Sequence, residues 1–212
     1  MEITWLGHSC FRLRSREAVV LTDPCPPASG YSIGKPTADI VTISHEHPGH
    51  SYRKAVGGTP MFITAPGEYE IGGVFIAGVA TFHDSSRGKE RGKNTAYVIE
   101  MDDVRLCHLG DLGHLPTPEQ VEEMSGVDVL LTPVGGKSTI DAAAAAEVVS
   151  LLEPRVVIPM HYQTAHSTAD LEPLQRFLKE MGLSGAEATA KLSLTASNLP
   201  HETQVMVLDY KR

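Results

Sequence analysis

Apolar and polar residues alternate through the first half of the chain with the period of two that is typical of half-buried β-strands. The pattern predicts strands over 2–6, 10–13, 18–22, 38–44, 61–64, 67–71, 74–77, 95–100 and 104–108. The β pattern that begins at residue 61 continues to residue 81 and is terminated by His83 and Asp84. Proline, glycine and serine are frequent over 24–36, so we expect a loop there. A short helix is expected over 51–56, because two glycines follow it.

The pattern changes after residue 108, where helical segments alternate with short apolar runs. Thr117, Pro118 and Gln120 combine an N-cap, a first-turn proline and a capping-box partner, which predicts a helix ending at Gly126. Further helices are expected over 141–153 and 171–181, and strands over 127–132, 156–158, 191–194 and 204–208. No repeat or long linker divides the chain, so we expect a single α/β domain over 1–212.

The composition is that of an ordinary globular protein, with 42% hydrophobic residues and a net charge of −8. The acidic balance argues against a nucleic-acid backbone as partner, since proteins that bind it usually carry a basic stripe. A small-molecule substrate is the expected partner, and a homo-oligomer stays open. No signal peptide and no apolar run of roughly 20 residues is present. Three cysteines without a C-x-x-C pair suit a reducing compartment, so we expect a cytoplasmic protein.

Histidines and one aspartate follow directly after expected strands at four places in the chain. They are His45, His47 and His50 after the first of these strands, then His83, Asp111 and His161. Because strands that share a sheet bring their ends to one edge, we expect these side chains to converge on one site. Five imidazoles and one carboxylate suit a pair of borderline divalent metals better than calcium or magnesium.

These residues resemble the motif of the metallo-β-lactamase superfamily, which is His-x-His-x-Asp-His after a strand, followed by a later His, Asp and His. The likeness extends to the bacterial branch that includes ascorbate-6-phosphate lactonase and related metal-dependent hydrolases. It is carried by residues 4–9, 21–24, 92–95, 109–114, 133–136 and 158–162, and so runs nearly end to end. The resemblance implies an αββα sandwich of two mixed β-sheets, with metals at the rim between them.

Carried over residue by residue, the resemblance implies two metal sites. Their ligands would be His45, His47 and His83 for the first metal, and His50 and His161 for the second. Asp111 would bridge both metals and hold the attacking water, and Asp111, His50 and His161 would be the catalytic residues. Asp23 matches an aspartate beneath the site that orients a ligand histidine. Zinc is the expected metal, with manganese or iron as alternatives.

Gly49 departs from the motif, because the family has an aspartate there that ligates the second metal. Losing a residue that supports a metal ligand typically lowers the metal affinity 10- to 100-fold. Losing a residue that binds the metal directly should lower the affinity at least as much. Glu46 is a poor replacement, since alternate positions point inward and Glu46 should point away. Three outcomes stay open: one tight metal, two metals with a water or substrate oxygen filling the gap, or a decayed site.

Each of the other polar residues near the expected site allows two interpretations of its role. His8, His114 and Tyr162 either contact the substrate or are structural, and Asp84 either caps a loop or supports a ligand. Asn94 either donates to a substrate oxygen or occupies a turn. The basic loop 87–93 is by default solvated; if it borders the site, it attracts an anionic substrate.

The sequence therefore predicts a metal-dependent hydrolase of a small ester, lactone or phosphodiester. A bound metal would lower the pKa of its water toward ~7 to give a hydroxide and would polarise a carbonyl or phosphoryl oxygen. The alternative, prompted by Gly49, is a catalytically impaired protein that uses the same fold for ligand binding or regulation.

Overall fold

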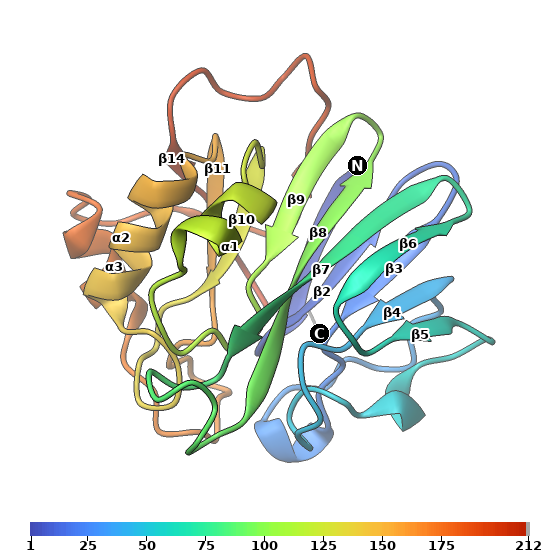
Figure 1. Ribbon diagram of the computed structural model, residues 1–212, viewed down its shortest axis with the longest axis horizontal. Coiled ribbons are helices and arrows are strands. Elements are labelled where there is room, and N and C mark those ends of the chain that lie inside the picture. Colours follow the sequence, from blue (N-terminus) through green and yellow to red (C-terminus); the bar gives the residue numbers. More distant parts are fainter. Residues whose placement is uncertain (211–212) are drawn as a thin grey trace.

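Two mixed β-sheets form the body of the computed structural model, which describes residues 1–210 (Figure 1). The first sheet has six strands. In spatial order they are β13 (Leu192–Ser193), β1 (Glu2–Gly7), β2 (Cys10–Arg14), β3 (Val19–Thr22), β4 (Ile40–Thr42) and β5 (Met61–Ile63). Strands β3, β4 and β5 are parallel, and the others pair antiparallel.

The second sheet has seven strands. In spatial order they are β14 (Gln204–Val205), β11 (Val156–Met160), β10 (Val129–Pro133), β9 (Val104–His108), β8 (Lys93–Met101), β7 (Val74–Phe82) and β6 (Gly67–Ile71). Strands β9, β10 and β11 are parallel, whereas β8 runs against both β9 and β7. Strand β7 therefore points the same way as β9, β10 and β11. A separate pair joins β12 (Ala188–Thr189) to β15 (Val207–Leu208).

The two sheets share one hydrophobic core. Along β1 buried and half-buried residues alternate, so that Ile3 and Trp5 point inward together. They belong to the same buried cluster as Ile76, Val98 and Leu106 of the second sheet. The period-two pattern of the sequence thus records which face of each strand packs against the other sheet.

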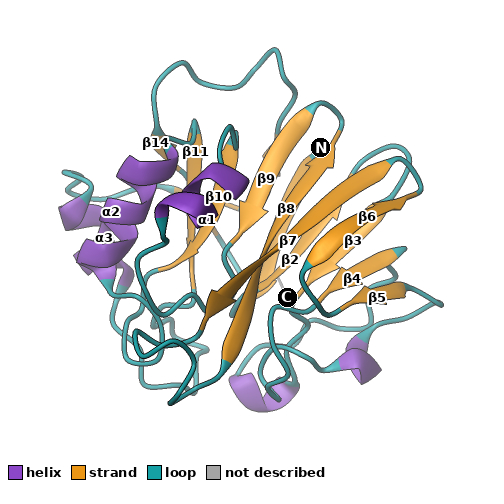
Figure 2. Ribbon diagram, in the orientation of Figure 1, coloured by secondary structure: helices purple, strands orange, loops and turns teal. Residues whose placement is uncertain are grey.

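Three α-helices lie on the β10–β11 side of the molecule (Figure 2). They are α1 (Pro118–Glu123), α2 (Ala142–Leu152) and α3 (Leu174–Glu180). Thr117 caps α1 through the expected capping box with Gln120. Helix α3 begins three residues later than expected, because Pro173 occupies the N-cap position. No helix among the described residues has the length and apolar content needed to cross a membrane.

The first sheet carries only short 3₁₀ turns. The helix expected over 51–56 is one such turn at Arg53–Ala55, and a second turn, Pro27–Ser29, lies inside the expected loop. Strand β4 is shorter than expected, because the chain leaves the sheet at Ile43. The segment that carries the histidines is therefore a loop that begins at the carboxyl end of a parallel strand.

Candidate metal centre

The strand ends bring four histidines around the carboxylate of Asp111. The Nε2 atoms of these histidines face Asp111 Oδ2 at 3.1 Å from His50, 3.4 Å from His83, 3.5 Å from His161 and 4.0 Å from His45. They come from the ends of β4, β7 and β11, and Asp111 follows β9. The parallel directions of β7, β9 and β11 explain why residues so distant in sequence meet at one edge.

Asp23 lies beneath His50 and fixes its ring. Asp23 follows β3 and is fully buried, and its Oδ2 lies 3.0 Å from His50 Nδ1. Its two oxygens also accept hydrogen bonds from the backbone N–H (2.7 Å) and the hydroxyl (2.5 Å) of Ser44. A proton on Nδ1 that is held by Asp23 leaves Nε2 of His50 with its lone pair toward Asp111. This is the geometry that we expected of Asp23.

Asn94 and Gly110 place Asp111 within the cluster. The Oδ1 atom of Asn94 accepts from the Asp111 backbone N–H at 3.0 Å, and its Nδ2 donates to Thr81 and to the Leu109 carbonyl. Both ends of this buried amide are therefore used within the protein, and Asn94 lies in strand β8 and not in a turn. The expected donation to a substrate oxygen stays a prediction. Gly110 has φ of +59°, and a Cβ there would lie 2.4 Å from Ser44 Cβ, so the turn requires glycine.

The possible metal-ligand atoms fall into three overlapping groups. The first is His45, His83 and Asp111, the second is His45, His47 and His50, and the third is His8, His50 and His161. His47 thus groups with His45 and His50, whereas His83 groups with His45 and Asp111. The first-metal set that we expected, His45, His47 and His83, is divided between two groups that share His45.

Charge balance favours a cation within this cluster. Burial would raise the pKa of Asp111, but the imidazoles of His161 and His50 hold it well below its usual range. Burial would lower the pKa of His50, but Asp111 and Asp23 together raise it to about 10. Burial lowers the pKa of His45 to about 4 and that of His161 below its usual value. His45 and His161 are therefore neutral, which is the form that binds metals, whereas His50 carries a proton between two ionised carboxylates and releases it when it binds a metal.

The residues fit a divalent metal. Asp111 Oδ1 and His45 Nε2 are buried and have no hydrogen-bond partner among the described residues. A buried polar atom without a partner is costly, and a metal ion would satisfy both atoms. Imidazole nitrogens with one or two carboxylates are the donors of zinc and of related transition metals. Among the candidates, zinc, manganese and iron all accept this set.

Glu46 and Asp84 serve the loops around the cluster. The carboxylate of Glu46 pairs with Arg53 on the surface, and Glu46 also lines the cleft beside His45. Asp84 accepts hydrogen bonds from four backbone N–H groups, those of Ser86, Gly88, Glu90 and Arg91. Of its two expected roles, the structure thus shows the loop cap. Burial raises the pKa of Asp84, but these four donors outweigh it and lower the pKa to about 2.

His114 and Tyr162 both make contacts within the fold, and the substrate contacts that we considered for them stay predictions. His114 Nε2 accepts from the Phe82 backbone N–H at 3.1 Å, and Nδ1 donates to the Leu115 carbonyl at 2.8 Å. Tyr162 is buried in the hydrophobic core, with its ring 5.4 Å from that of Trp5. Both residues follow a ligand candidate along the chain, yet both support the fold.

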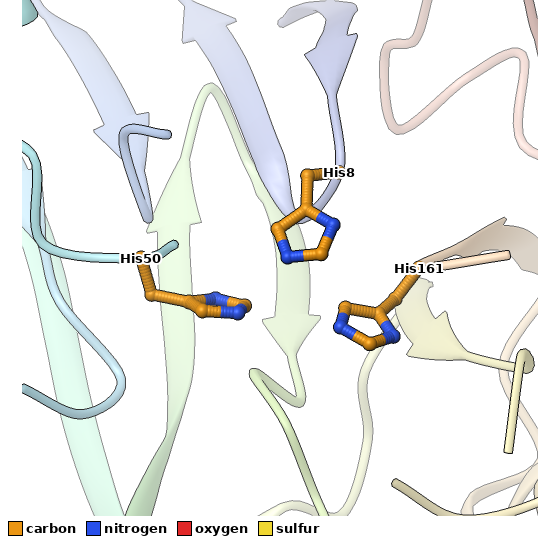
Figure 3. A group of neighbouring side chains, drawn as sticks. All are labelled: His8, His50 and His161. Carbon is orange, nitrogen blue, oxygen red and sulfur yellow. The ribbon is translucent and has the colours of Figure 1, made fainter. Parts of the chain in front are cut away.

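His8 joins the cluster from the tight turn between β1 and β2. Its ring lies 4.3 Å from that of His161 and 4.8 Å from that of His50, and the three rings surround one space (Figure 3). The sequence offered one signal, because His8 directly follows a strand, as do the other candidates. We gave this residue a substrate or a structural role and did not include it among the ligands.

A cleft of about 830 Å³ opens beside His45. Its apolar wall includes Pro66 and Phe82. Arg91 and Lys93 place two positive charges along it, and Glu46, which pairs with Arg53, is the acidic residue in its lining. The remaining basic residues of the loop 87–93, which are Arg87 and Lys89, are not among the described residues that line the cleft. The loop therefore borders the site through its carboxyl-terminal part only.

Comparison with known proteins identifies the family. The β-lactamase superfamily domain matches residues 2–161. A UPF0173 protein of Pyrococcus furiosus is 32% identical over 203 residues, which cover 85% of this chain and 91% of that protein. A UPF0173 metal-dependent hydrolase of Pyrococcus horikoshii is 30% identical over 208 residues, which cover 84% of this chain and 92% of that protein. The chain therefore belongs to the β-lactamase superfamily.

A solved structure agrees with this assignment. The crystal structure described as a candidate zinc-dependent hydrolase of the metallo-β-lactamase superfamily, from Thermotoga maritima, is 43% identical and superposes with a TM-score of 0.81. The match covers 98% of this chain and 97% of that one. The predicted family and fold class are confirmed, and the names of the relatives agree with the expected metal-dependent hydrolase. The likeness to ascorbate-6-phosphate lactonase stays a prediction.

Proposed function

We propose that this protein is a metal-dependent hydrolase of small anionic esters, lactones or phosphodiesters, with zinc as the metal. The convergence of four imidazole Nε2 atoms on one Asp111 oxygen, beside an open cleft, is the observation that carries the proposal. His45, His47 and His83 would hold the first metal, and His50 and His161 the second, with Asp111 between them. Manganese and iron are the alternatives that the metal analysis below distinguishes.

A divalent metal held here would lower the pKa of a coordinated water toward about 7 and polarise the carbonyl or phosphoryl oxygen of the substrate. The contribution of the chain is to fix the donors in advance. Asp23 holds the His50 ring in one tautomer, and Asn94 holds the Asp111 backbone. Because both supports are buried, the donors keep their positions while the substrate binds and leaves.

The charge of the cleft supports an anionic substrate. Arg91 and Lys93 are exposed and line the same cleft as His45. Lys93 has no ion-pair partner among residues 1–210, so its charge is available to a ligand. In an acidic protein, such a local positive field raises the concentration of anions at the site.

The test is a turnover screen over ester, lactone and phosphodiester substrates, with the metal content of each sample determined by elemental analysis. We expect turnover that is lost on chelation and restored by zinc. Asp111→Asn should abolish it, whereas Asp39→Asn, which makes the same change at an exposed position, should not. Tight binding of a substrate without any turnover in the metal-loaded protein would instead favour the binding or regulatory alternative.

The substrate charge is tested separately. Arg91→Ala and Lys93→Ala should each raise KM about fivefold for anionic substrates, which corresponds to ~1 kcal/mol for an exposed charge pair. Neutral substrates should be unaffected. Arg87→Ala and Lys89→Ala, on the same loop but outside the cleft, are the matched controls. Equal effects of all four variants would show that only the general charge of the protein matters.

A further inference from the structure

Gly49 stands where the family motif has an aspartate, and its backbone does not require glycine. Unlike the glycines of the tight turns, it has no left-handed φ. A Cβ built on Gly49 would lie 3.2 Å from His47 Nδ1 and 3.5 Å from His8 Nε2. The local conformation therefore admits a side chain, but imidazoles already occupy the space that the side chain would enter.

The His8 ring occupies that space from the opposite side. His8 is only 8% exposed, and neither of its ring nitrogens makes a hydrogen bond to another residue in the described part of the chain. Its backbone has φ of +54°, which is uncommon for a residue other than glycine and costs free energy. A nearly buried imidazole on a strained backbone, whose ring nitrogens pair with no other described residue, is available to bind a ligand.

The backbone contacts of His8 fix the position of this ring. Its carbonyl accepts from Trp5 Nε1 at 3.0 Å and from the His161 backbone N–H at 3.3 Å. The turn between β1 and β2 is thus joined directly to the end of β11. A ligand atom of His8 lies within 4.8 Å of a ligand atom of both His50 and His161, and Figure 3 shows all three rings directed toward the same space.

We propose that His8 replaces the missing aspartate as the third histidine ligand of the second metal, beside His50, His161 and the shared Asp111. This inference rests on the proposed metal-dependent function and deepens it. Gly49 then is not a lost ligand but the small residue that leaves room for the His8 ring. Of the outcomes left open by the sequence, it favours two metals, with an imidazole and not a water filling the gap.

The exchange changes the charge of the site. A neutral imidazole in place of a carboxylate removes one negative charge beside the second metal. With Asp111 as the only carboxylate among the proposed ligands, the loaded site carries one more positive charge than the motif with aspartate. The added charge favours a substrate that brings its own negative charge, which agrees with Arg91 and Lys93 along the cleft.

The experiment measures zinc equivalents and the dissociation constant of each by competition with a chromophoric chelator. It compares the natural protein with His8→Gly, Gly49→Asp and the double variant. Glycine at position 8 also relieves the positive φ, so the backbone change does not itself destabilise the turn. His201→Ala, at an exposed histidine outside the cluster, is the control. Circular dichroism verifies that each variant is folded.

We expect two equivalents in the natural protein and in His201→Ala. His8→Gly should bind the first zinc ion as the natural protein does. It should bind the second with an affinity that is lower by 100-fold or more, because it lacks a residue that binds the metal directly. Gly49→Asp alone should not tighten the second metal, because the His8 ring occupies the space. In the double variant the aspartate enters the vacated space, so the second affinity should return to within about tenfold of the natural value.

The outcomes separate this inference from the proposed function. Folded His8→Gly that binds both metals within threefold of the natural affinities would overturn the role of His8 and leave the hydrolase proposal standing. A double variant that binds the second metal no better than His8→Gly would also overturn the role of His8. A natural protein that binds no zinc, manganese or iron would overturn the proposed function itself. Substitution with cobalt gives an independent readout, because the visible absorption of Co²⁺ changes when a ligand is lost or exchanged.

Discussion

Replacing Asp23 with asparagine should weaken metal binding although Asp23 is not itself a proposed ligand. The carboxylate is fully buried and accepts three hydrogen bonds, two from Ser44 and one from the His50 Nδ1–H. Asparagine has the same shape but presents an NH₂ group in place of one oxygen. If this group faces His50, the proton moves to Nε2, and the nitrogen directed at Asp111 can no longer bind a metal.

The opposite orientation of the amide is also unfavourable. It keeps an acceptor toward His50 but turns the NH₂ group toward the Ser44 N–H, so that a buried donor loses its partner. The loss of a group that orients a ligand histidine typically costs 10- to 100-fold in metal affinity. We therefore expect Asp23→Asn to weaken the second metal by about 1.4–2.7 kcal/mol.

The assay is a zinc competition titration at pH 7.5, with Asp39→Asn as the control. Asp39 is exposed, and its carboxylate accepts from the Val19 backbone N–H, so this variant makes the same charge change far from the cluster. Asp23→Asn that stays folded and binds both metals within threefold of the natural affinities would refute the reasoning. Asp23 would then be a structural residue only.

The remaining predictions concern stability. Gly110→Ala should lower the free energy of unfolding by about 2–4 kcal/mol in urea, because it combines a left-handed φ with a 2.4 Å approach to Ser44; a loss below ~0.5 kcal/mol would contradict this. The pKa of Asp84 is lowered to about 2 from 3.8, so its stabilisation is complete above pH 4 and lost toward pH 2. In metal-free protein, the difference in Tm between natural protein and Asp84→Asn should shrink over that interval; a constant difference would refute the assignment. Zinc at 100 times its Kd should raise the free energy of unfolding by about 2.7 kcal/mol, which corresponds to roughly 5–10 °C in Tm. Asp111→Asn should show little of this shift.

The strand ends could be predicted because they depend on a periodic signal. The strands before His45 and His161 are buried apolar runs, whereas the strand before Asp111 also contains Arg105. In each case the candidate ligand follows within three residues of the strand end. Since strand direction decides which ends meet, a parallel arrangement was enough to bring these side chains together. The family resemblance added the αββα sandwich of two sheets, which periodicity alone does not contain.

The hydrogen-bond partners and packing contacts of individual polar groups could not be predicted in this way. Asn94, His114 and Tyr162 all lie close to ligand candidates in sequence, yet their hydrogen bonds and packing hold loops and core. Which partner a buried amide or imidazole finds depends on distances of a few tenths of an ångström between segments far apart in the chain. The sequence carries no local signal for such contacts.

His8 and Gly49 illustrate the same limit at the site itself. They are separated by 41 positions in the sequence, and each seemed to be explained locally: His8 by a turn, and Gly49 by the loss of a ligand. Only the structure places the His8 ring 3.5 Å from where a side chain on Gly49 would begin. In the proposed arrangement, the one departure from the motif at Gly49 is compensated by a histidine from a distant part of the chain.

The most direct test of the account is a crystal structure of the zinc-loaded protein, with anomalous data collected on both sides of the zinc absorption edge. We predict two zinc peaks that flank Asp111 Oδ2, one beside His45, His47 and His83 and the other among His50, His161 and His8. Zinc peaks that lie only outside this cluster, in crystals grown with an excess of zinc, would contradict it.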